Sequence, residues 1–293
     1  MNKNLYAPST IRDIKERHNF RLSKSLGQNF LTDKNIRDKI IEETHITKED
    51  LVIEIGPGIG VLTHEAAEKA GKVIAIEIDK GLIPILKETL SDCTNVEIIN
   101  RDILKTDLNE ILEQNEVING QKRRCVRIMG NLPYYITTPI IMKILEDGIK
   151  ADSITIMMQK EVAERIVSGP GSKAYGAISV AVQYYCDVFN VANVPRDVFV
   201  PQPNVDSAVL RLDIRKEKAA ELKDEALFFA CVRAGFGQRR KTLLNSLTGL
   251  EGLSKQEVSE LLEKADIQPS RRAETLSLSE FAKLANFVYD MKN

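Results

Sequence analysis

The chain has 293 residues, of which 43% are hydrophobic and 28% are charged, and its formal net charge is −1. This length suits one large domain with a smaller one, and this charge excludes a uniformly basic coat for nucleic acid. The first twenty residues carry scattered charges, no apolar stretch is long enough to cross a bilayer, and four dispersed cysteines form no CxxC pair. We therefore expect a reduced, cytoplasmic protein without disulfides, membrane contact or bound metal.

Short β-branched runs alternate with helical patterns from residue 51 to about residue 159, which is typical of a parallel sheet flanked by helices. The predicted strands are 51–55, 72–76, 96–99, 126–129 and 153–158, and the predicted helices between them are 61–70, 82–90 and 139–145. Helices near 161–167 and 177–185 then precede strands 188–194 and 208–214. These last two strands would close the sheet as an antiparallel hairpin.

The segment 213–225 is rich in Lys and Glu and predicts a linker. Beyond it, residues 227–234, 241–247, 255–264 and 280–289 read as helices without strands. We therefore place an α/β domain at residues 1–215, with an N-terminal arm, and a small all-helical domain at residues 216–293.

The first predicted strand runs into the loop Gly56-Pro57-Gly58-Ile59-Gly60 and then directly into a helix. Glycines at such a turn allow a ligand to approach the backbone closely, so Gly56 and Gly58 are candidate contacts of a nucleotide-like cofactor. A dinucleotide fingerprint would need a different glycine spacing, and no phosphate-gripping GxxxxGK[ST] sequence occurs. The alternative is an ordinary tight turn.

Two acidic residues follow the next strands. Glu77 ends the second strand, where a carboxylate accepts hydrogen bonds from a ribose, and Asp102 follows the third strand, where it would accept from an adenine amino group. Either acid alone is more often a surface charge. Together, at the ends of successive strands, they predict a nucleoside pocket.

The fourth strand ends in Asn131-Leu132-Pro133-Tyr134, before a helix expected to begin near Thr137 or Thr138. Pro133 keeps Leu132 extended, so a main-chain carbonyl of Leu132 or Pro133 and the Asn131 amide oxygen would hold an exocyclic amine. Tyr134 would stack against the base that carries this amine. An ordinary strand-ending turn is the alternative.

A proline-rich segment, Phe199-Val200-Pro201-Gln202-Pro203-Asn204-Val205-Asp206-Ser207, follows the hairpin region. It is either a surface connector or a rigid loop that places Phe199 on the opposite face of a flipped-out base. None of the three histidines, at positions 18, 45 and 64, forms a metal or triad pattern. A reaction at this site would therefore depend mainly on the alignment of its reactants.

Five motifs in this order, QNFL at 28–31, EIGPGIG at 54–60, NLPY at 131–134, FVPQPNVDS at 199–207 and GFGQRRK at 235–241, resemble the ribosomal RNA adenine N6-dimethyltransferases. The resemblance runs from about Leu22 to the C-terminus and implies a Rossmann-like class I methyltransferase sheet. It further implies that S-adenosyl-L-methionine contacts Asn29, Leu31, Gly56, Glu77, Asp102 and Asn131. The catalytic pocket implied by the resemblance consists of Asn131, Leu132, Tyr134 and Phe199.

Two branches of this family differ in substrate. One dimethylates two adjacent adenosines in a hairpin loop near the 3′ end of small-subunit ribosomal RNA, and the Erm-type enzymes modify large-subunit RNA. The near-neutral charge and long C-terminal region of this chain resemble the first branch. The alternatives are the Erm-type activity, a DNA adenine methyltransferase, and an RNA-binding assembly factor without turnover.

The expected partner is ribosomal RNA in a pre-30S particle, bound by a monomer. Candidate phosphate contacts are Arg233, Arg239, Arg240 and Lys241, which lie close together without an intervening acid. Arg271, Arg272 and the basic segment 12–24 would extend this face, although exposed basic residues are usually only solvated.

Overall fold

The computed structural model describes residues 4–20, 26–238 and 240–293, and it separates into two compact units. The first unit comprises Met1–Ala163 and Phe189–Ile214, and the second comprises Glu164–Val188 and Arg215–Asn293. The chain thus passes from the first unit to the second after Ile214, and an additional internal segment belongs to the second unit. The functional division at residue 215 stays a prediction.

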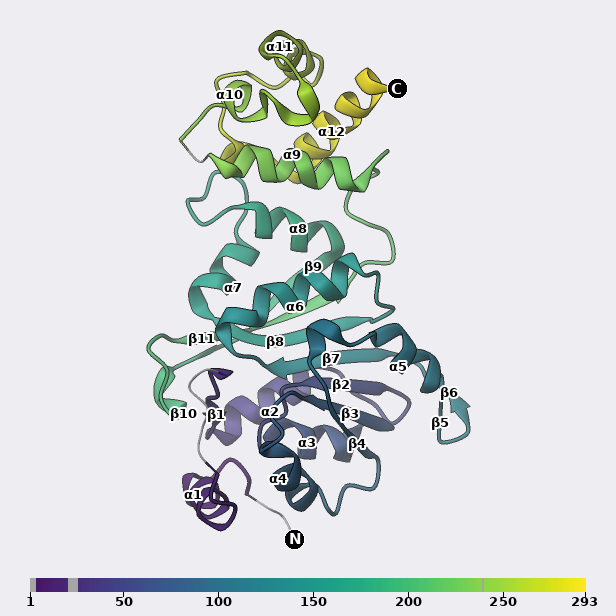
Figure 1. Ribbon diagram of the computed structural model, residues 1–293, viewed down its shortest axis with the longest axis vertical. Coiled ribbons are helices and arrows are strands. Elements are labelled where there is room, and N and C mark those ends of the chain that lie inside the picture. Colours follow the sequence, from purple (N-terminus) through teal and green to yellow (C-terminus); the bar gives the residue numbers. More distant parts are fainter. Residues whose placement is uncertain (1–3, 21–25, 239) are drawn as a thin grey trace. The chain divides into compact units, whose positions relative to one another are not determined.

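A seven-stranded sheet forms the centre of the first unit (Figure 1). The strand order is β4-β3-β2-β7-β8-β11-β9. Pairing is parallel from β4 to β8, and β11 runs antiparallel to β8. This confirms the predicted α/β sheet with its antiparallel closing strands. The bounds are β2 (Leu51–Ile55), β3 (Lys72–Glu77), β4 (Val96–Asn100), β7 (Val126–Asn131), β8 (Ser153–Gln159), β9 (Cys186–Val194) and β11 (Ser207–Ile214).

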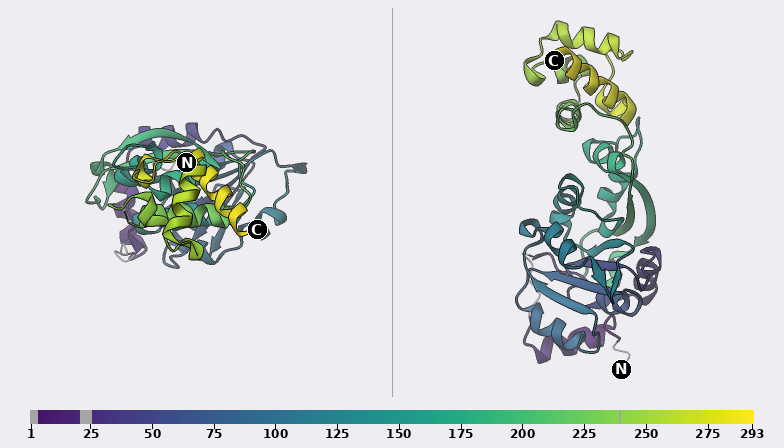
Figure 2. Two further views of the ribbon diagram at one scale, coloured as in Figure 1. Left: turned by 90° about the horizontal axis from the view of Figure 1, so that it is seen from above. Right: turned by 90° about the vertical axis from the view of Figure 1, so that its right-hand side faces the viewer.

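Helices cover both faces of this sheet, as Figure 2 (right) shows. All five residues of β2, Glu54 included, are buried, as expected for a central parallel strand that is covered on both faces. Helices α2 (Lys34–Glu43) and α3 (Val61–Lys69) pack on one face, where their apolar side chains join those of the strands in one core cluster. Helix α6 (Tyr134–Glu146) contacts β8, and α1 (Pro8–Arg17) shares an apolar cluster with α4 (Leu82–Thr89).

Helix α6 begins at Tyr134, so the expected start near Thr137 or Thr138 is wrong. Pro133 is the N-cap residue, with φ −55° and ψ 132°, and a residue so placed allows the helix to begin immediately after it. The first turn of the helix therefore carries two adjacent tyrosines. The remaining elements of this unit are short: β1 (Phe30–Leu31), η2 (Ile103–Lys105), α5 (Leu108–Gln114), β5 (Val117–Ile118), β6 (Gln121–Lys122), η3 (Arg196–Val198) and β10 (Phe199–Val200).

From residue 215 onward the described part of the chain contains helices and no strand, as predicted. Helices α11 and α12 both begin with a capping box, at Ser254 with Glu257 and at Ser277 with Glu280. Phe228 and Phe281 are fully buried in this second unit. Its elements are α7 (Lys160–Val167, shared with the first unit), α8 (Ala177–Tyr185), α9 (Glu225–Gly237), α10 (Leu243–Leu247), η4 (Leu250–Gly252), α11 (Lys255–Lys264), η5 (Ala273–Thr275) and α12 (Leu278–Lys292). Across the described ranges, no helix combines the length and apolar character that a bilayer crossing requires.

Candidate functional site

A pocket of about 1060 Å³, with the open space at its mouth included, lies at the carboxyl ends of β2, β3 and β7. Ligands of open α/β sheets bind at this end of the strands. The pocket brings together ten of the predicted site residues from five segments of the chain. They are Asn29, Leu31, Gly56, Gly58, Glu77, Asp102, Asn131, Leu132, Pro133 and Tyr134.

The glycine loop has the backbone conformation that requires glycine. Gly56, Gly58 and Gly60 have φ values of +68°, +61° and +90°. A Cβ atom on Gly58 would lie 3.0 Å from Cε1 of Phe30, so the aromatic ring of β1 closes on the loop. Gly60 is the N-cap residue of α3. The glycines therefore let the main chain of the loop lie close to the pocket.

Two buried carboxylic acids lie below this loop. Glu77 accepts hydrogen bonds from the main-chain N–H of Asp79 at 2.8 Å and of Gly58 at 3.4 Å, and burial raises the pKa of Glu77 to about 7. Glu54 is 1% exposed, and its Oε2 has no hydrogen-bond partner. Burial, together with repulsion from Glu77, raises the pKa of Glu54 to about 8. A hydrogen-bond donor or a positive charge near these two carboxyl groups would favour their ionised forms.

Asp102 also lines the pocket, just after β4, the strand that pairs with β3. Its Oδ1 accepts from the main-chain N–H of Leu104 at 3.0 Å, which fixes the carboxylate at the start of η2. Gln28, from the segment before β1, donates to Asp79 Oδ2 at 2.7 Å. A nucleoside bound between Glu77 and Asp102 would therefore meet acceptors for its ribose and for an amino group.

Asn131 ends β7 with its side chain in the pocket. Its Nδ2 donates to the main-chain carbonyl of Asn29 at 2.9 Å. A carbonyl oxygen can only accept, so the amide nitrogen must face Asn29, and Oδ1 is directed elsewhere. The preceding residue, Gly130, lies close to the end of β2, because a Cβ atom there would lie 2.5 Å from the carbonyl oxygen of Ile55. The hydrogen bond thus determines which side of the Asn131 amide faces Asn29.

Tyr134 and Tyr135 both line the pocket but differ in exposure. The Tyr134 hydroxyl hydrogen-bonds the hydroxyl of Ser207 at 2.7 Å, and burial raises the pKa of this phenol. The Tyr135 side chain is 62% exposed at the pocket rim. Sequence reasoning did not single out Tyr135. Its place in the first turn of α6 could have been found only with the correct start of that helix.

Phe199 is 3% exposed and belongs to the core cluster that includes Leu31 and Met157. It pairs with Leu31 in the two-stranded ladder of β1 and β10. It is not among the residues that line the pocket. The predicted contact between Phe199 and the target base stays a prediction, and it would require this ring to turn toward the pocket.

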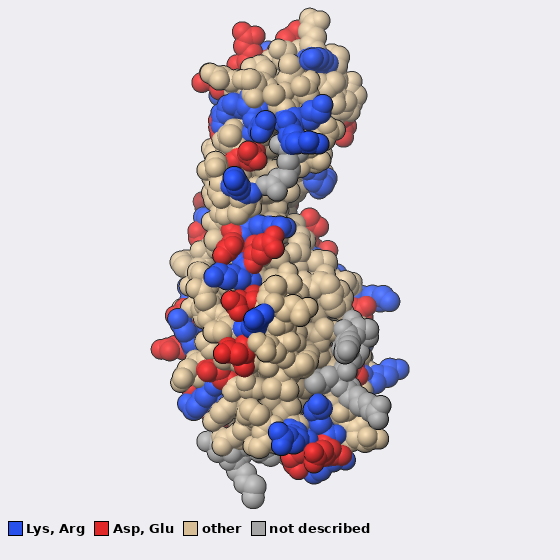
Figure 3. Space-filling model, turned by 90° about the vertical axis from the view of Figure 1, so that its left-hand side faces the viewer, with Lys and Arg blue, Asp and Glu red and all other residues tan. Residues whose placement is uncertain are grey.

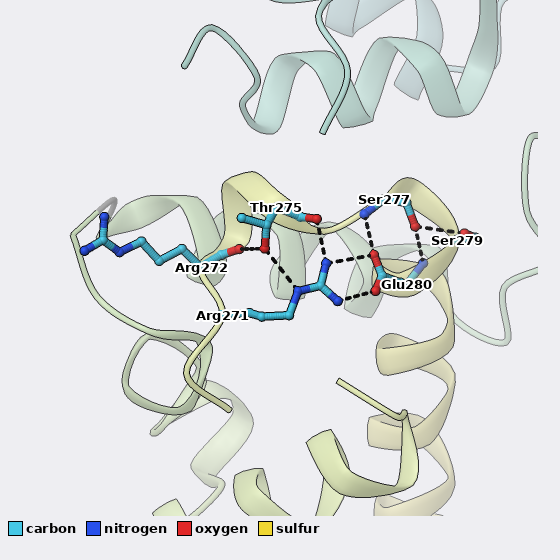
Figure 4. Close-up of polar contacts among 6 residues, drawn as sticks. All are labelled: Arg271, Arg272, Thr275, Ser277, Ser279 and Glu280. Carbon is cyan, nitrogen blue, oxygen red and sulfur yellow. Dashed lines mark hydrogen bonds and ion pairs between the residues drawn. The ribbon is translucent and has the colours of Figure 1, made fainter. Parts of the chain in front are cut away.

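The predicted RNA contacts lie in the second unit. Arg233, Arg240 and Lys241 are exposed, and Arg239 lies outside the described residues. Arg271 donates to both carboxylate oxygens of Glu280, at 2.5 Å and 3.2 Å, and to the carbonyl of Thr275 (Figure 4). Figure 4 also shows that the exposed Arg272 side chain extends away from this network. Arg271 therefore links the segment before α12 to the first turn of that helix, and Arg272 is exposed.

Known proteins resemble this chain over nearly its whole length. The sequence profile of a family described as "Ribosomal RNA adenine dimethylase" matches residues 19–290. A "Ribosomal RNA small subunit methyltransferase A" of Clostridioides difficile is 52% identical, over 97% of this chain and 96% of the relative, and one of Alkaliphilus metalliredigens is 51% identical over 97% and 98%.

Solved structures agree with this relationship. A dimethyladenosine transferase from Plasmodium falciparum superposes with a TM-score of 0.72 and 27% identity, over 87% of this chain and 95% of that one. The 23S rRNA methyltransferase ErmE superposes with a TM-score of 0.67 and 25% identity, over 89% and 99%.

Proposed function

The chain belongs to the ribosomal RNA adenine dimethylase family, and we propose that it dimethylates the N6 amino groups of two adjacent adenosines in the 3′-terminal hairpin loop of small-subunit ribosomal RNA. The chain is an S-adenosyl-L-methionine-dependent methyltransferase of small-subunit rRNA adenine. The observation that supports the finer proposal is the hydrogen bond from Asn131 Nδ2 to the carbonyl of Asn29, in the pocket at the carboxyl ends of the strands.

The pocket residues fit the methyl donor. Glu77 would accept from the ribose hydroxyls and Asp102 from the adenine amino group, while the main chain at Gly56 and Gly58 would approach the amino acid portion. The unpartnered Glu54 Oε2 lies below the loop, where positive charge on the ligand would favour its ionised form. When bound, the donor supplies an intrinsically electrophilic methyl group, so the protein mainly provides alignment.

The target nitrogen is a poor nucleophile, because its lone pair is delocalised into the adenine ring. Asn131 Oδ1 and the main-chain carbonyl of Leu132 or Pro133 would accept hydrogen bonds from the amino group and favour a more tetrahedral nitrogen. Tyr134, held by Ser207, would stack against the extruded base, a contact worth about 1–3 kcal/mol. Phe199 would bound the other face of the base after a side-chain rotation. Tyr135 at the rim would offer a second stacking surface to the neighbouring adenosine.

The helical unit would bind phosphates of the folded RNA. Figure 3 shows Lys and Arg side chains gathered in a band across the upper part of this view. Arg233, Arg240, Lys241 and Arg272 are exposed in this unit and would set position and affinity without reading sequence. Arg239 directly precedes Arg240 in the sequence, and we propose that it also contacts phosphates. We propose that a monomer acts in the cytoplasm on a pre-30S particle, where RNA is recognised largely by shape.

Two alternatives differ from this proposal. An Erm-type enzyme that acts on large-subunit RNA should be more similar to ErmE than to the small-subunit methyltransferases. This chain is 25% identical to ErmE and 51–52% identical to the two small-subunit relatives. A non-catalytic assembly factor would not need the oriented amide of Asn131.

Nucleoside analysis of ribosomal RNA from cells that lack this protein tests the proposal. We expect dimethyladenosine to disappear from small-subunit RNA and to return when the wild-type chain is supplied. Loss of the modification from large-subunit RNA instead would support the Erm-type alternative. Unchanged dimethyladenosine in both RNAs would contradict a catalytic role altogether.

A further inference from the structure

Three side chains with metal-binding atoms meet on the first unit, outside the pocket described above. His64 lies in α3, and Asp92 and Cys93 lie in the loop between α4 and β4. One ligand atom from each residue lies within 4.8 Å of the others. Within residues 4–20, 26–238 and 240–293, this is the one such group of three. None of the three lines the cofactor pocket.

The distances suit an ion between the side chains. His64 Nε2 lies 3.7 Å from Asp92 Oδ2, which is longer than the roughly 2.7–3.2 Å of a hydrogen bond. Cys93 Sγ lies 4.0 Å from Asp92 Oδ1. Zinc bonds of about 2.0 Å to nitrogen and oxygen and about 2.3 Å to sulfur give tetrahedral edges of about 3.3–3.6 Å. The two distances to Asp92 exceed these edges by less than 1 Å, and all three ligand atoms lie within 4.8 Å of one another, so small side-chain rotations would bring them to coordination distance.

The surroundings support a cation. His64 is 7% exposed, so its imidazole is held by the packing of α3, and the thiol of Cys93 is half-buried beside it. A groove of about 810 Å³, open to solvent, contains all three side chains and also Glu68, one helical turn after His64. Lys48 lines the same groove, and its ammonium donates to the carbonyl of Ala70 at 3.4 Å. A fourth ligand would come from water or from Glu68.

We propose that His64, Asp92 and Cys93 bind one Zn²⁺ ion. A thiolate and a carboxylate neutralise the divalent charge, and a neutral imidazole completes the mixed sulfur, nitrogen and oxygen set that zinc accepts. Binding breaks the Cys93 S–H bond, forms a zinc–sulfur bond and releases one proton to solvent. The ion would join α3, which begins at the glycine loop, to the loop after α4. A Cβ atom on Gly60 would already lie 3.1 Å from Cδ2 of Leu90, so these segments are in contact.

Titration of the untagged full chain with Co²⁺ and Zn²⁺ tests this site. We expect one Co²⁺ per chain, a thiolate-to-cobalt absorption band, and its displacement by one equivalent of Zn²⁺. At Zn²⁺ about 100-fold above its dissociation constant, the melting temperature would rise by about 5 °C. A wild-type chain that binds neither ion with defined stoichiometry overturns the proposal.

Matched variants separate this site from incidental binding. Cys93→Ser should abolish the charge-transfer band and weaken binding at least about 100-fold. Asp92→Asn changes an exposed residue, so it should weaken binding while the chain stays folded. Cys125→Ser alters another half-buried cysteine and should leave binding unchanged. Equal metal affinity in Cys93→Ser and wild type would overturn the assignment.

Discussion

The side-chain amide of Asn131 donates a 2.9 Å hydrogen bond to the main-chain carbonyl of Asn29, across 102 positions of sequence. This contact ties the segment before β1 to the end of β7. It holds the amide nitrogen of Asn131 against Asn29, and the proposed role of Oδ1 as an acceptor for the target amine depends on this orientation. Preorganised acceptors and donors of this kind lower activation barriers because they need no rearrangement during reaction.

Asn131→Ala should reduce methyl transfer at least about 100-fold, because it removes the oriented acceptor of the target amine. Transfer of labelled methyl groups to undermethylated small subunits measures this effect. Binding of the variant to the same particles, measured by sedimentation, should remain close to that of wild type. Near-normal turnover would contradict the role of this amide.

Phe199→Leu should weaken catalysis more than cofactor affinity, because the predicted contact is with the base and not with the methyl donor. Leucine is preferable to alanine here, since truncation of this buried ring to alanine would cost about 3–5 kcal/mol of stability. Single-turnover rates and calorimetric affinity for S-adenosyl-L-methionine separate the two effects. A loss of cofactor affinity with an unchanged rate would contradict the placement.

Gly58→Ala should weaken cofactor binding at least about tenfold, because the new Cβ would lie 3.0 Å from Phe30 in a backbone conformation that alanine disfavours. Gly120→Ala is the matched control. Gly120 also has a positive φ, of +79°, but a Cβ atom there would meet no other atom within 4 Å. Calorimetry should show normal cofactor affinity in the control, and similar losses in both variants would indicate a general effect on folding.

Tyr135→Ala should raise the KM for the RNA substrate about tenfold, because removal of an exposed stacking surface costs about 1–3 kcal/mol per base. The cofactor dissociation constant should not change. Mass spectrometry of partially reacted RNA would show whether one of the two adenosines is affected more strongly. An unchanged KM with a reduced cofactor affinity would place Tyr135 on the donor side instead.

Local patterns predicted much of this structure, and long-range contacts account for what they missed. The runs that form β2 and β3 are mostly apolar, and the glycine loop follows β2 directly, so these features could be predicted from neighbouring residues. The burial of Phe199 depends on its pairing with Leu31, 168 positions earlier. The proximity of His64 and Cys93 depends on how the loop after α4 returns to α3. No local sequence pattern specifies contacts between segments that are this far apart in the chain.

Cofactor affinity should increase as pH rises through the range of about 6 to 8.5, because Glu77 and Glu54 must ionise to receive a cationic, hydroxyl-bearing ligand. In the free protein burial raises the pKa of Glu77 to about 7 and that of Glu54 to about 8. Below these values binding must displace protons, at a cost of up to about 1.4 kcal/mol per pH unit for each group. Calorimetry in phosphate and in Tris, whose ionisation enthalpies differ, counts the protons released.

The free energy of unfolding of the unliganded protein should decrease as pH rises, whereas cofactor affinity should increase. Both acids have folded-state pKa values above their unfolded value of 4.5, so their stabilising protonation is complete below that value. This contribution is lost as pH rises toward about 7 for Glu77 and about 8 for Glu54. The melting temperature of Glu54→Gln should therefore decrease less than that of wild type between about pH 7 and pH 8. Glu113→Gln, at an exposed position in α5, should show the same decrease as wild type. An identical pH profile in wild type and Glu54→Gln would show that this acid does not titrate in the folded chain.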